Sequence, residues 1–246
     1  MAVWSFEISI RAQEPSQSST PSAEIPKGYE ICTMERSHRD ASGATETEHE
    51  KMTSPDGRFA VLCPVRDEVH DQEENPVYPP NLLVRLQPYA VLAQVKKPGL
   101  PIGWRHDLRA EWSGNSVVTV WEYGKWGIVD LSVYEIENDK VKRVHPVFRE
   151  ARKYFDRDFR QRFLKKYPKE YDSFTFVSGG DKPDQTPDFK FEGRRLVLDV
   201  SAENKPNLAP GPTWRADLHA IWNLDTGKFE KVDFQPGEIT VRKPED

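Results

Sequence analysis

Apolar and polar residues alternate along much of the chain, most clearly in a nine-residue pattern that occurs twice. Residues 104–112 read WRHDLRAEW and residues 214–222 read WRADLHAIW, so both fit W-R-x-D-L-x-A-x-W. In each copy the Trp, Leu, Ala and second Trp share one parity, while the other parity carries most of the charge. This period of two is typical of a strand with one buried face. The pattern therefore predicts two half-buried strands.

Further strand-like segments lie between turn signals. They cover residues 28–34, 59–65, 81–86, 89–95, 111–121 (with a turn at Gly114-Asn115), 127–137, 189–200 and 228–234. Turns are expected at Pro55-Asp56-Gly57, Asn138-Asp139 and Asp225-Thr226-Gly227, because these residue types suit turn backbone angles. Residues 35–51 are polar, have little to bury and predict a loop.

One segment follows a helical period instead. Apolar residues recur there at steps of three and four, at Phe148, Ala151, Phe155, Phe159 and Phe163. This spacing is that of an amphipathic helix. Pro146 suits a first helical turn and Pro168 stops a helix, so we expect an inserted helix at about residues 146–168.

The expected helix is strongly basic. Residues 149–166 contain eight Lys or Arg and three acidic residues, for a net charge of +5. We expect the Phe side chains to pack on a sheet while the charged face is solvated and partly paired with acidic residues. The alternative is a basic surface for an anionic partner.

Length and composition fit a β-rich fold. The chain has 246 residues, with 37% hydrophobic and 30% charged, and its 20 prolines and 14 glycines suit many short elements joined by turns. We expect a mainly β fold, with hairpins in an irregular propeller-like or sandwich arrangement around one inserted amphipathic helix. Residues 1–27 are expected to be a signal remnant and flexible leader, and residues 28–246 a single β-rich domain.

The N-terminus and the cysteines bear on location. Residues 3–10, VWSFEISI, form a largely apolar segment interrupted by Glu7, and Ala12 would suit a signal-peptide cleavage site if the true start lies upstream. The alternative is a first strand. Export would place the protein in the periplasm or outside the cell, with the cytoplasm as the alternative. Cys32 and Cys63 form either one disulfide in an oxidising compartment or two buried thiols, and sequence leaves both open.

Residues 54–62, with the sequence SPDGRFAVL, resemble the turn and second strand of TolB-like propeller repeats. Residues 111–121, with a Trp-Ser before Gly-Asn, fit the same pattern, as do residues 189–200. The order of elements over residues 54–237 also resembles that of uncharacterised exported bacterial proteins, a group that implies no known activity. The resemblance implies three blade-like units. A closed propeller has at least about four blades, so we do not expect a regular ring.

Sequence motifs for common catalytic and metal sites are missing. H-E-x-x-H, H-x-H, G-x-S-x-G and C-x-x-C do not occur, so neither a metal nor a cofactor is expected. The best acid–base candidates are Asp107 and Asp217, at matching positions of the repeated pattern, with His106 and His219 near them in sequence. The alternative for these residues is cross-strand pairing on a solvated face.

Aromatic residues gather around the hairpin expected at Gly124-Lys125. They are Trp112, Trp121, Tyr123, Trp126 and Tyr134. Aromatic rings near a hairpin tip can bind sugars or peptides, so Tyr123 and Trp126 are candidate ligand-binding residues. Packing in the core is the alternative, and it is favoured for Trp112 and Trp121.

The sequence as a whole favours a non-enzymatic binding or interaction module of the cell envelope. Its expected partner is a protein, a peptide or a glycan. The alternative is a hydrolase of unrecognised type that uses the acids of the repeated strands. A net charge of −5 disfavours nucleic acid as partner, and no run of about 18 apolar residues predicts a membrane span.

Overall fold

The computed structural model describes residues 25–39, 45–65, 79–95, 107–124, 127–178, 188–204 and 211–241. These residues form fifteen strands and one helical segment. The expected mainly β fold with a single inserted helix is confirmed. The strands form three separate sheets, none of which closes into a ring in the described part of the chain.

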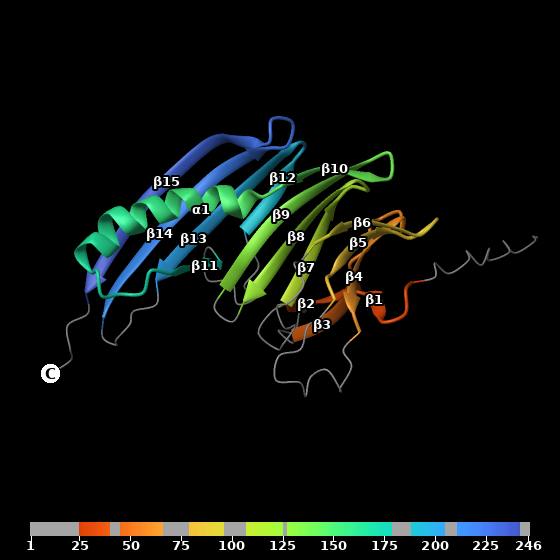
Figure 1. The fold of residues 1–246 in the computed structure, drawn as a ribbon, viewed down its shortest axis with the longest axis horizontal. Coiled ribbons are helices and arrows are strands. Elements are labelled where there is room, and N and C mark those ends of the chain that lie inside the picture. Colours follow the sequence, from red (N-terminus) through yellow and green to blue (C-terminus); the bar gives the residue numbers. More distant parts are fainter. Residues whose placement is uncertain are drawn as a thin grey trace, which may run out of the picture.

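Nine strands form one large, curved antiparallel sheet (Figure 1). Its central path runs in the order β15-β14-β13-β11-β9-β8-β7, while β10 pairs with β9 and β12 pairs with β13. The strands are β7 (Asp107–Ser113), β8 (Val117–Gly124), β9 (Gly127–Glu137), β10 (Lys140–His145), β11 (Phe174–Ser178), β12 (Asp188–Glu192), β13 (Arg195–Asn204), β14 (Pro212–Asn223) and β15 (Lys228–Val241). Both copies of the repeated pattern are therefore in strands, with residues 104–106 outside the described part.

An N-terminal layer packs against the β7 end of this sheet (Figure 1). It contains a four-stranded sheet in the order β1-β4-β5-β6 and the hairpin β2–β3. The strands are β1 (Tyr29–Ile31), β2 (Thr33–Arg39), β3 (Thr45–Lys51), β4 (Phe59–Pro64), β5 (Leu82–Arg85) and β6 (Ala90–Gln94). The loop expected at residues 35–51 is wrong, because backbone pairing makes a hairpin from a polar segment. A disulfide joins Cys32 to Cys63 in this layer, with Cα atoms 5.2 Å apart.

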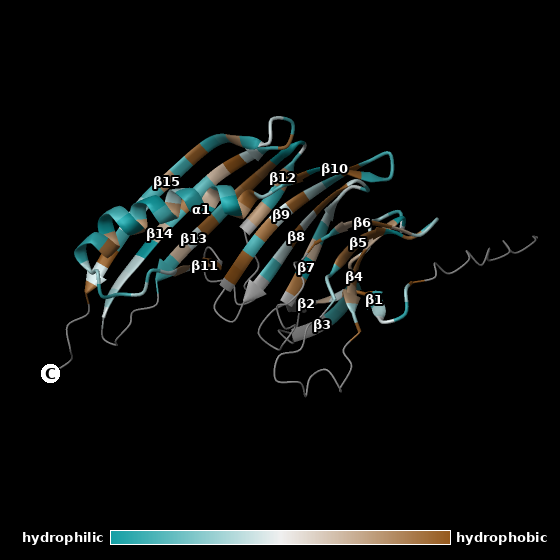
Figure 2. Ribbon diagram, in the orientation of Figure 1, coloured by the Kyte–Doolittle hydropathy of each residue, from teal (hydrophilic) through white to brown (hydrophobic). Residues whose placement is uncertain are grey.

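The expected helix is also confirmed. It consists of α1 (Val147–Asp158), which continues directly as the π-helical turn η2 (Phe159–Leu164). The five apolar positions that predicted it are all buried against the sheet. Its outer surface is hydrophilic, as expected of a helix docked by one face (Figure 2).

The large sheet has a core on each face. The helix-side core lies between α1–η2 and strands β9, β11, β13 and β14. The N-terminal core lies between strands β7–β9 and the N-terminal layer. Strand β8 contributes to both, with Trp121 in the first and Val120 in the second. The two copies of the repeated pattern therefore bury opposite faces of one sheet, Leu218 in the helix-side core and Leu108 in the N-terminal core.

Candidate functional site

The repeated acids do not come together. Asp107 begins β7 and Asp217 lies in β14, and four strands of the sheet path separate β7 from β14. At about 4.8 Å between neighbouring strands, these positions are on the order of 20 Å apart. The side chain of Asp107 and all of His106 lie outside the described residues. The geometry thus offers no paired carboxylates from the two copies.

Asp217 and His219 lie instead in a cross-strand ladder on the sheet face opposite α1. Nδ1 of His219 is 2.6 Å from Oδ1 of Asp199, and Asp217 accepts a hydrogen bond from the Ser201 hydroxyl. Both pairs are direct neighbours across β13 and β14. A nucleophilic serine is commonly activated by an imidazole that accepts its proton. Here the Ser201 hydroxyl bonds to the carboxylate of Asp217, and the imidazole of His219 bonds to Asp199 instead. The arrangement is that of cross-strand polar pairs on a solvated face.

The described aromatic residues of the hairpin cluster are packed in the two cores. Trp121 is buried edge-on to Phe189, and Trp112 stacks on Phe59 with ring centroids 6.2 Å apart. Tyr134 is buried, and this desolvation raises its pKa to about 12. Trp126 and the side chain of Tyr123 lie outside the described residues. The ligand-binding prediction for these two residues stays a prediction.

A groove between α1 and the β14–β15 hairpin is the best candidate for a binding site. Its volume is about 370 Å³. Helix α1 contributes Glu150, Lys153, Tyr154 and Arg157, and the hairpin contributes Trp222, Gly227, Lys228 and Phe229. Its two walls come from segments about 70 residues apart in the chain, and this separation explains why no local sequence motif predicts it.

Three aromatic rings lie in series along this groove. The rings of Tyr154 and Phe229 meet nearly at right angles with centroids 6.2 Å apart. Phe229 in turn meets Trp222 edge-to-face at 4.9 Å. Edge-to-face contacts of this kind fix ring orientations. Trp222 is buried, so Tyr154 and Phe229 provide the aromatic surface that the groove exposes.

The charges of the groove are predominantly positive. Lys153 pairs with Glu150 one helical turn earlier, and this leaves two further cations. The guanidinium of Arg157 lies 5.8 Å from the centroid of the Tyr154 ring, and Lys228 is exposed at the start of β15. In the described part of the chain, neither Arg157 nor Lys228 has a carboxylate within ion-pair distance.

A buried polar chain supports the hairpin wall of the groove. The indole N–H of Trp222 donates to Nδ1 of His145 at 3.1 Å, and Nε2 of His145 lies 2.6 Å from Oε1 of Glu135. Because an indole N–H is only a donor, Nδ1 must be the accepting nitrogen, and the imidazole proton is on Nε2 facing Glu135. Trp222 is therefore held from inside the protein while its ring lines the groove.

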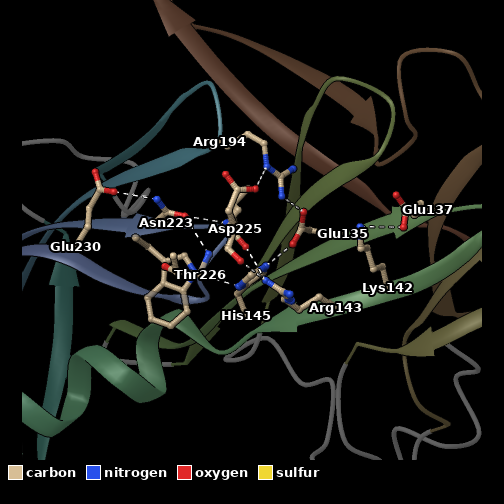
Figure 3. Close-up of polar contacts among 12 residues, drawn as sticks. Glu135, Glu137, Lys142, Arg143, His145, Arg194, Asn223, Asp225, Thr226 and Glu230 are labelled. Carbon is tan, nitrogen blue, oxygen red and sulfur yellow. Dashed lines mark hydrogen bonds and ion pairs between the residues drawn. The ribbon is translucent and has the colours of Figure 1, made fainter.

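Glu135 also binds Arg194, and this residue connects the buried polar chain of Trp222, His145 and Glu135 to the β14–β15 turn. Arg194 donates to the second oxygen of Glu135, and its Nε donates to Oδ1 of Asp225 at 2.6 Å (Figure 3). Burial raises the pKa of Glu135, but the hydrogen bonds from His145 and Arg194 outweigh it and leave the pKa below its usual value. The carboxylate is thus ionised and fully engaged.

The turn itself is fixed by further hydrogen bonds. Arg143 donates to the backbone carbonyls of Leu224 and Asp225 at 2.9 and 2.8 Å (Figure 3). The side-chain oxygen of Asn223 accepts two backbone N–H groups of the turn. Gly227 has a φ of +65°, a value that favours glycine. The turn expected at Asp225-Thr226-Gly227 is therefore confirmed. The groove therefore has one wall that is rigid before any ligand arrives.

Comparisons with protein-family models, with curated proteins and with solved structures found no match to this chain. Among the residues that the structure describes, no group of three or more His, Cys, Asp or Glu could hold a metal ion. No helix in the same residues is long and apolar enough to cross a membrane.

Proposed function

We propose that the chain is a non-enzymatic binding module of the cell envelope, and that the groove between α1 and β15 is its binding site. The groove itself carries the proposal. It combines a volume near the lower end of small-molecule sites with aromatic and charged walls and a rigid, hydrogen-bonded support. Its size suits a small molecule or a single group that projects from a peptide, a protein or a glycan.

The disulfide between Cys32 and Cys63 supports the location in this proposal. Disulfides persist in the periplasm and outside the cell, whereas the cytosol keeps thiols reduced. The resemblance of residues 54–62 to TolB-like repeats of exported proteins points the same way. Location thus rests on redox chemistry and resemblance, and binding rests on the groove.

The hydrolase alternative has less support. It would need acids of the two repeated strands in one cleft, and Asp107 and Asp217 lie on strands far apart in the sheet. It would also need a nucleophile beside a base, and the Ser201 hydroxyl is engaged by Asp217. Binding without reaction is the function that these contacts favour.

The test is to find where small probes bind to the ¹⁵N-labelled protein by NMR. We expect ring-containing, peptide and glycan probes to shift the backbone amide signals of Gly227 and Phe229, which line the groove. Lys153→Trp should abolish these shifts, because it fills the groove from the α1 wall. Lys165→Trp adds the same bulk outside the groove and should leave them unchanged. Probe shifts that persist in Lys153→Trp, or that gather elsewhere, would contradict the proposal.

A further inference from the structure

We infer that the groove binds a small aromatic anion, that is, a flat ring that carries a carboxylate or phosphate group. This inference rests on the proposed function, because it takes the groove as the binding site. It adds the chemical class of the ligand.

Most cations of the helical segment are already engaged in the fold. Arg162 pairs with Asp158, Arg160 with Asp172, and the Arg152 guanidinium lies 4.7 Å from the centroid of the Phe174 ring. Arg157 differs, because its guanidinium contacts the ring of Tyr154, itself a groove residue. Its guanidinium is thereby positioned at the groove with its hydrogen-bond donors available for an anion.

Lys228 adds a second positive charge from the opposite wall. It stands next to Gly227 at the hairpin, so its backbone position is fixed by the same turn that supports Trp222. One cation from each wall means that an anion between them would be attracted from two sides. Such a pair selects for a carboxylate or phosphate over a neutral group.

The rings determine the other half of the ligand. Phe229 contacts both Tyr154 and Trp222 edge-to-face, and a further flat ring would extend that series. The one acid of the groove, Glu150, is neutralised by Lys153 on the same helix, so it does not repel an anion. A ring and a negative charge on one small molecule therefore match the walls together.

The experiment is calorimetric titration of the full chain at low salt with four probes. They are phenyl phosphate, benzoate, inorganic phosphate and benzyl alcohol, which separate the ring from the charge. We expect phenyl phosphate or benzoate to bind about tenfold more tightly than inorganic phosphate and benzyl alcohol, and to weaken as salt is raised.

Matched variants locate the binding. Arg157→Gln and Lys228→Gln should each weaken binding of the aromatic anion about five- to tenfold. Arg160→Gln and Lys165→Gln remove the same charges outside the groove and should change affinity less than about twofold. Phe229→Leu should weaken phenyl phosphate while leaving inorganic phosphate unchanged, because only the first has a ring.

Each outcome bears on one part of the inference. If benzyl alcohol binds in the groove as tightly as the aromatic anions, the requirement for a charge is overturned while the proposed binding function stands. If inorganic phosphate binds as tightly as phenyl phosphate, the requirement for a ring is overturned. If the control variants weaken binding as much as Arg157→Gln and Lys228→Gln, the groove is not the anion site. Binding of no probe would overturn the inference and, with unshifted groove amides, the proposed function.

Discussion

Strands β14 and β7 carry the same nine-residue pattern but differ in what surrounds them. Strand β14 lies inside the large sheet beneath α1, and its Trp214 is completely buried. Strand β7 lies at the end of the sheet path beneath the N-terminal layer, and its Trp112 is partly exposed. An alternating pattern thus determines that a strand forms, while the covering layer determines how tightly its large residues are held.

Trp214 is held by a buried carboxylate. Its indole N–H donates to Oδ2 of Asp158 at 2.9 Å, and the backbone N–H of Gly237 donates to the same oxygen at 2.8 Å. Arg162 approaches the other oxygen at 3.2 Å. The buried charge of Asp158 is therefore compensated on both sides, as a buried carboxylate requires.

Trp112 has no comparable polar anchor. Its ring stacks on Phe59, and its indole nitrogen has no hydrogen-bond partner among the described residues. The surrounding N-terminal layer depends on other connections. They are the disulfide and the ion pairs from Arg58 and Arg85 to Asp139 at the β9–β10 turn. The helix-side core is thus held by a buried hydrogen-bond network, and the N-terminal core by a disulfide and by ion pairs at its edge.

The largest expected effect comes from Gly237→Ala, which attacks the anchor of Trp214. A Cβ at Gly237 would lie 1.7 Å from Nε1 of Trp214, far inside van der Waals contact. Either the indole or the strand must move, and the bonds to Asp158 would break with it. We expect a loss of about 3–5 kcal/mol in the free energy of unfolding, measured by chemical denaturation.

Gly193→Ala is the matched control for that change. Gly193 has a φ of +62° but open space around its Cβ position. Alanine there should cost only about 1–2 kcal/mol, from backbone strain alone. Equal losses for the two variants would show that the indole of Trp214 moves aside at little cost, and would contradict its role as a fixed anchor.

The next effect is removal of the disulfide, which weakens the other core. The double variant Cys32→Ser, Cys63→Ser opens a loop of 31 residues, and the entropy of such a loop corresponds to about 3–4 kcal/mol. Hydrogen exchange should become faster for the amides of β4 and β5, while those of β13 and β14 keep their protection. Uniform loss of protection across both cores would show instead that they unfold as one unit.

Trp-to-Phe substitutions compare one tryptophan from each copy, the first Trp of the pattern in β14 and the last in β7, and should have a smaller effect. Trp214→Phe removes one of the bonds that compensate Asp158 and should cost about 2–3 kcal/mol. Trp112→Phe keeps an aromatic ring on Phe59 and loses no described hydrogen bond, so it should cost less than about 1.5 kcal/mol. Denaturation midpoints of the two variants measure the difference, and a reversed order would contradict the comparison.

Local periodicity was sufficient to predict most elements of this fold. The helix from residue 147, strand β9 at residues 127–137 and the turn at Asp225-Thr226-Gly227 all follow from spacing and turn chemistry. The β2–β3 hairpin was missed because its residues are polar, and periodicity detects strands through what they bury. Strand β11 (Phe174–Ser178) was also missed, and its length is not the reason, because the equally short β5 and β6 lie in predicted segments.

The candidate site was beyond local sequence signals. Arg157 and Lys228 line the same groove only because helix α1 docks beside the β14–β15 hairpin. This docking depends on contacts across the whole sheet. Likewise, Glu135 and His145 meet because β9 and β10 pair in one register, while Arg194 reaches them from β12–β13. Sequence does show the basic helix and the turn, the two parts that the groove combines.

The smallest effect expected is a difference in acid sensitivity between the two sides of the sheet. Glu135 belongs to the network that supports the hairpin over the helix-side core, and its folded pKa lies below the usual value. As the pH falls, Glu135 is therefore protonated at a higher pH in the unfolded chain than in the folded chain. Stability from Glu135 is present above the unfolded pKa, near 4.3, and is lost as the pH falls through the lower folded pKa.

We expect acid to loosen the β14–β15 hairpin before the disulfide-linked N-terminal layer. The measurement is a ¹³C NMR titration of the Glu135 carboxyl group, together with hydrogen exchange of the hairpin amides between about pH 5 and 3. Arg194→Gln should raise the pKa of Glu135, because the guanidinium bond that lowers it is removed while burial remains. An unchanged pKa in that variant would mean that His145 alone keeps Glu135 ionised, and that the hairpin depends on the Trp222–His145–Glu135 chain without Arg194.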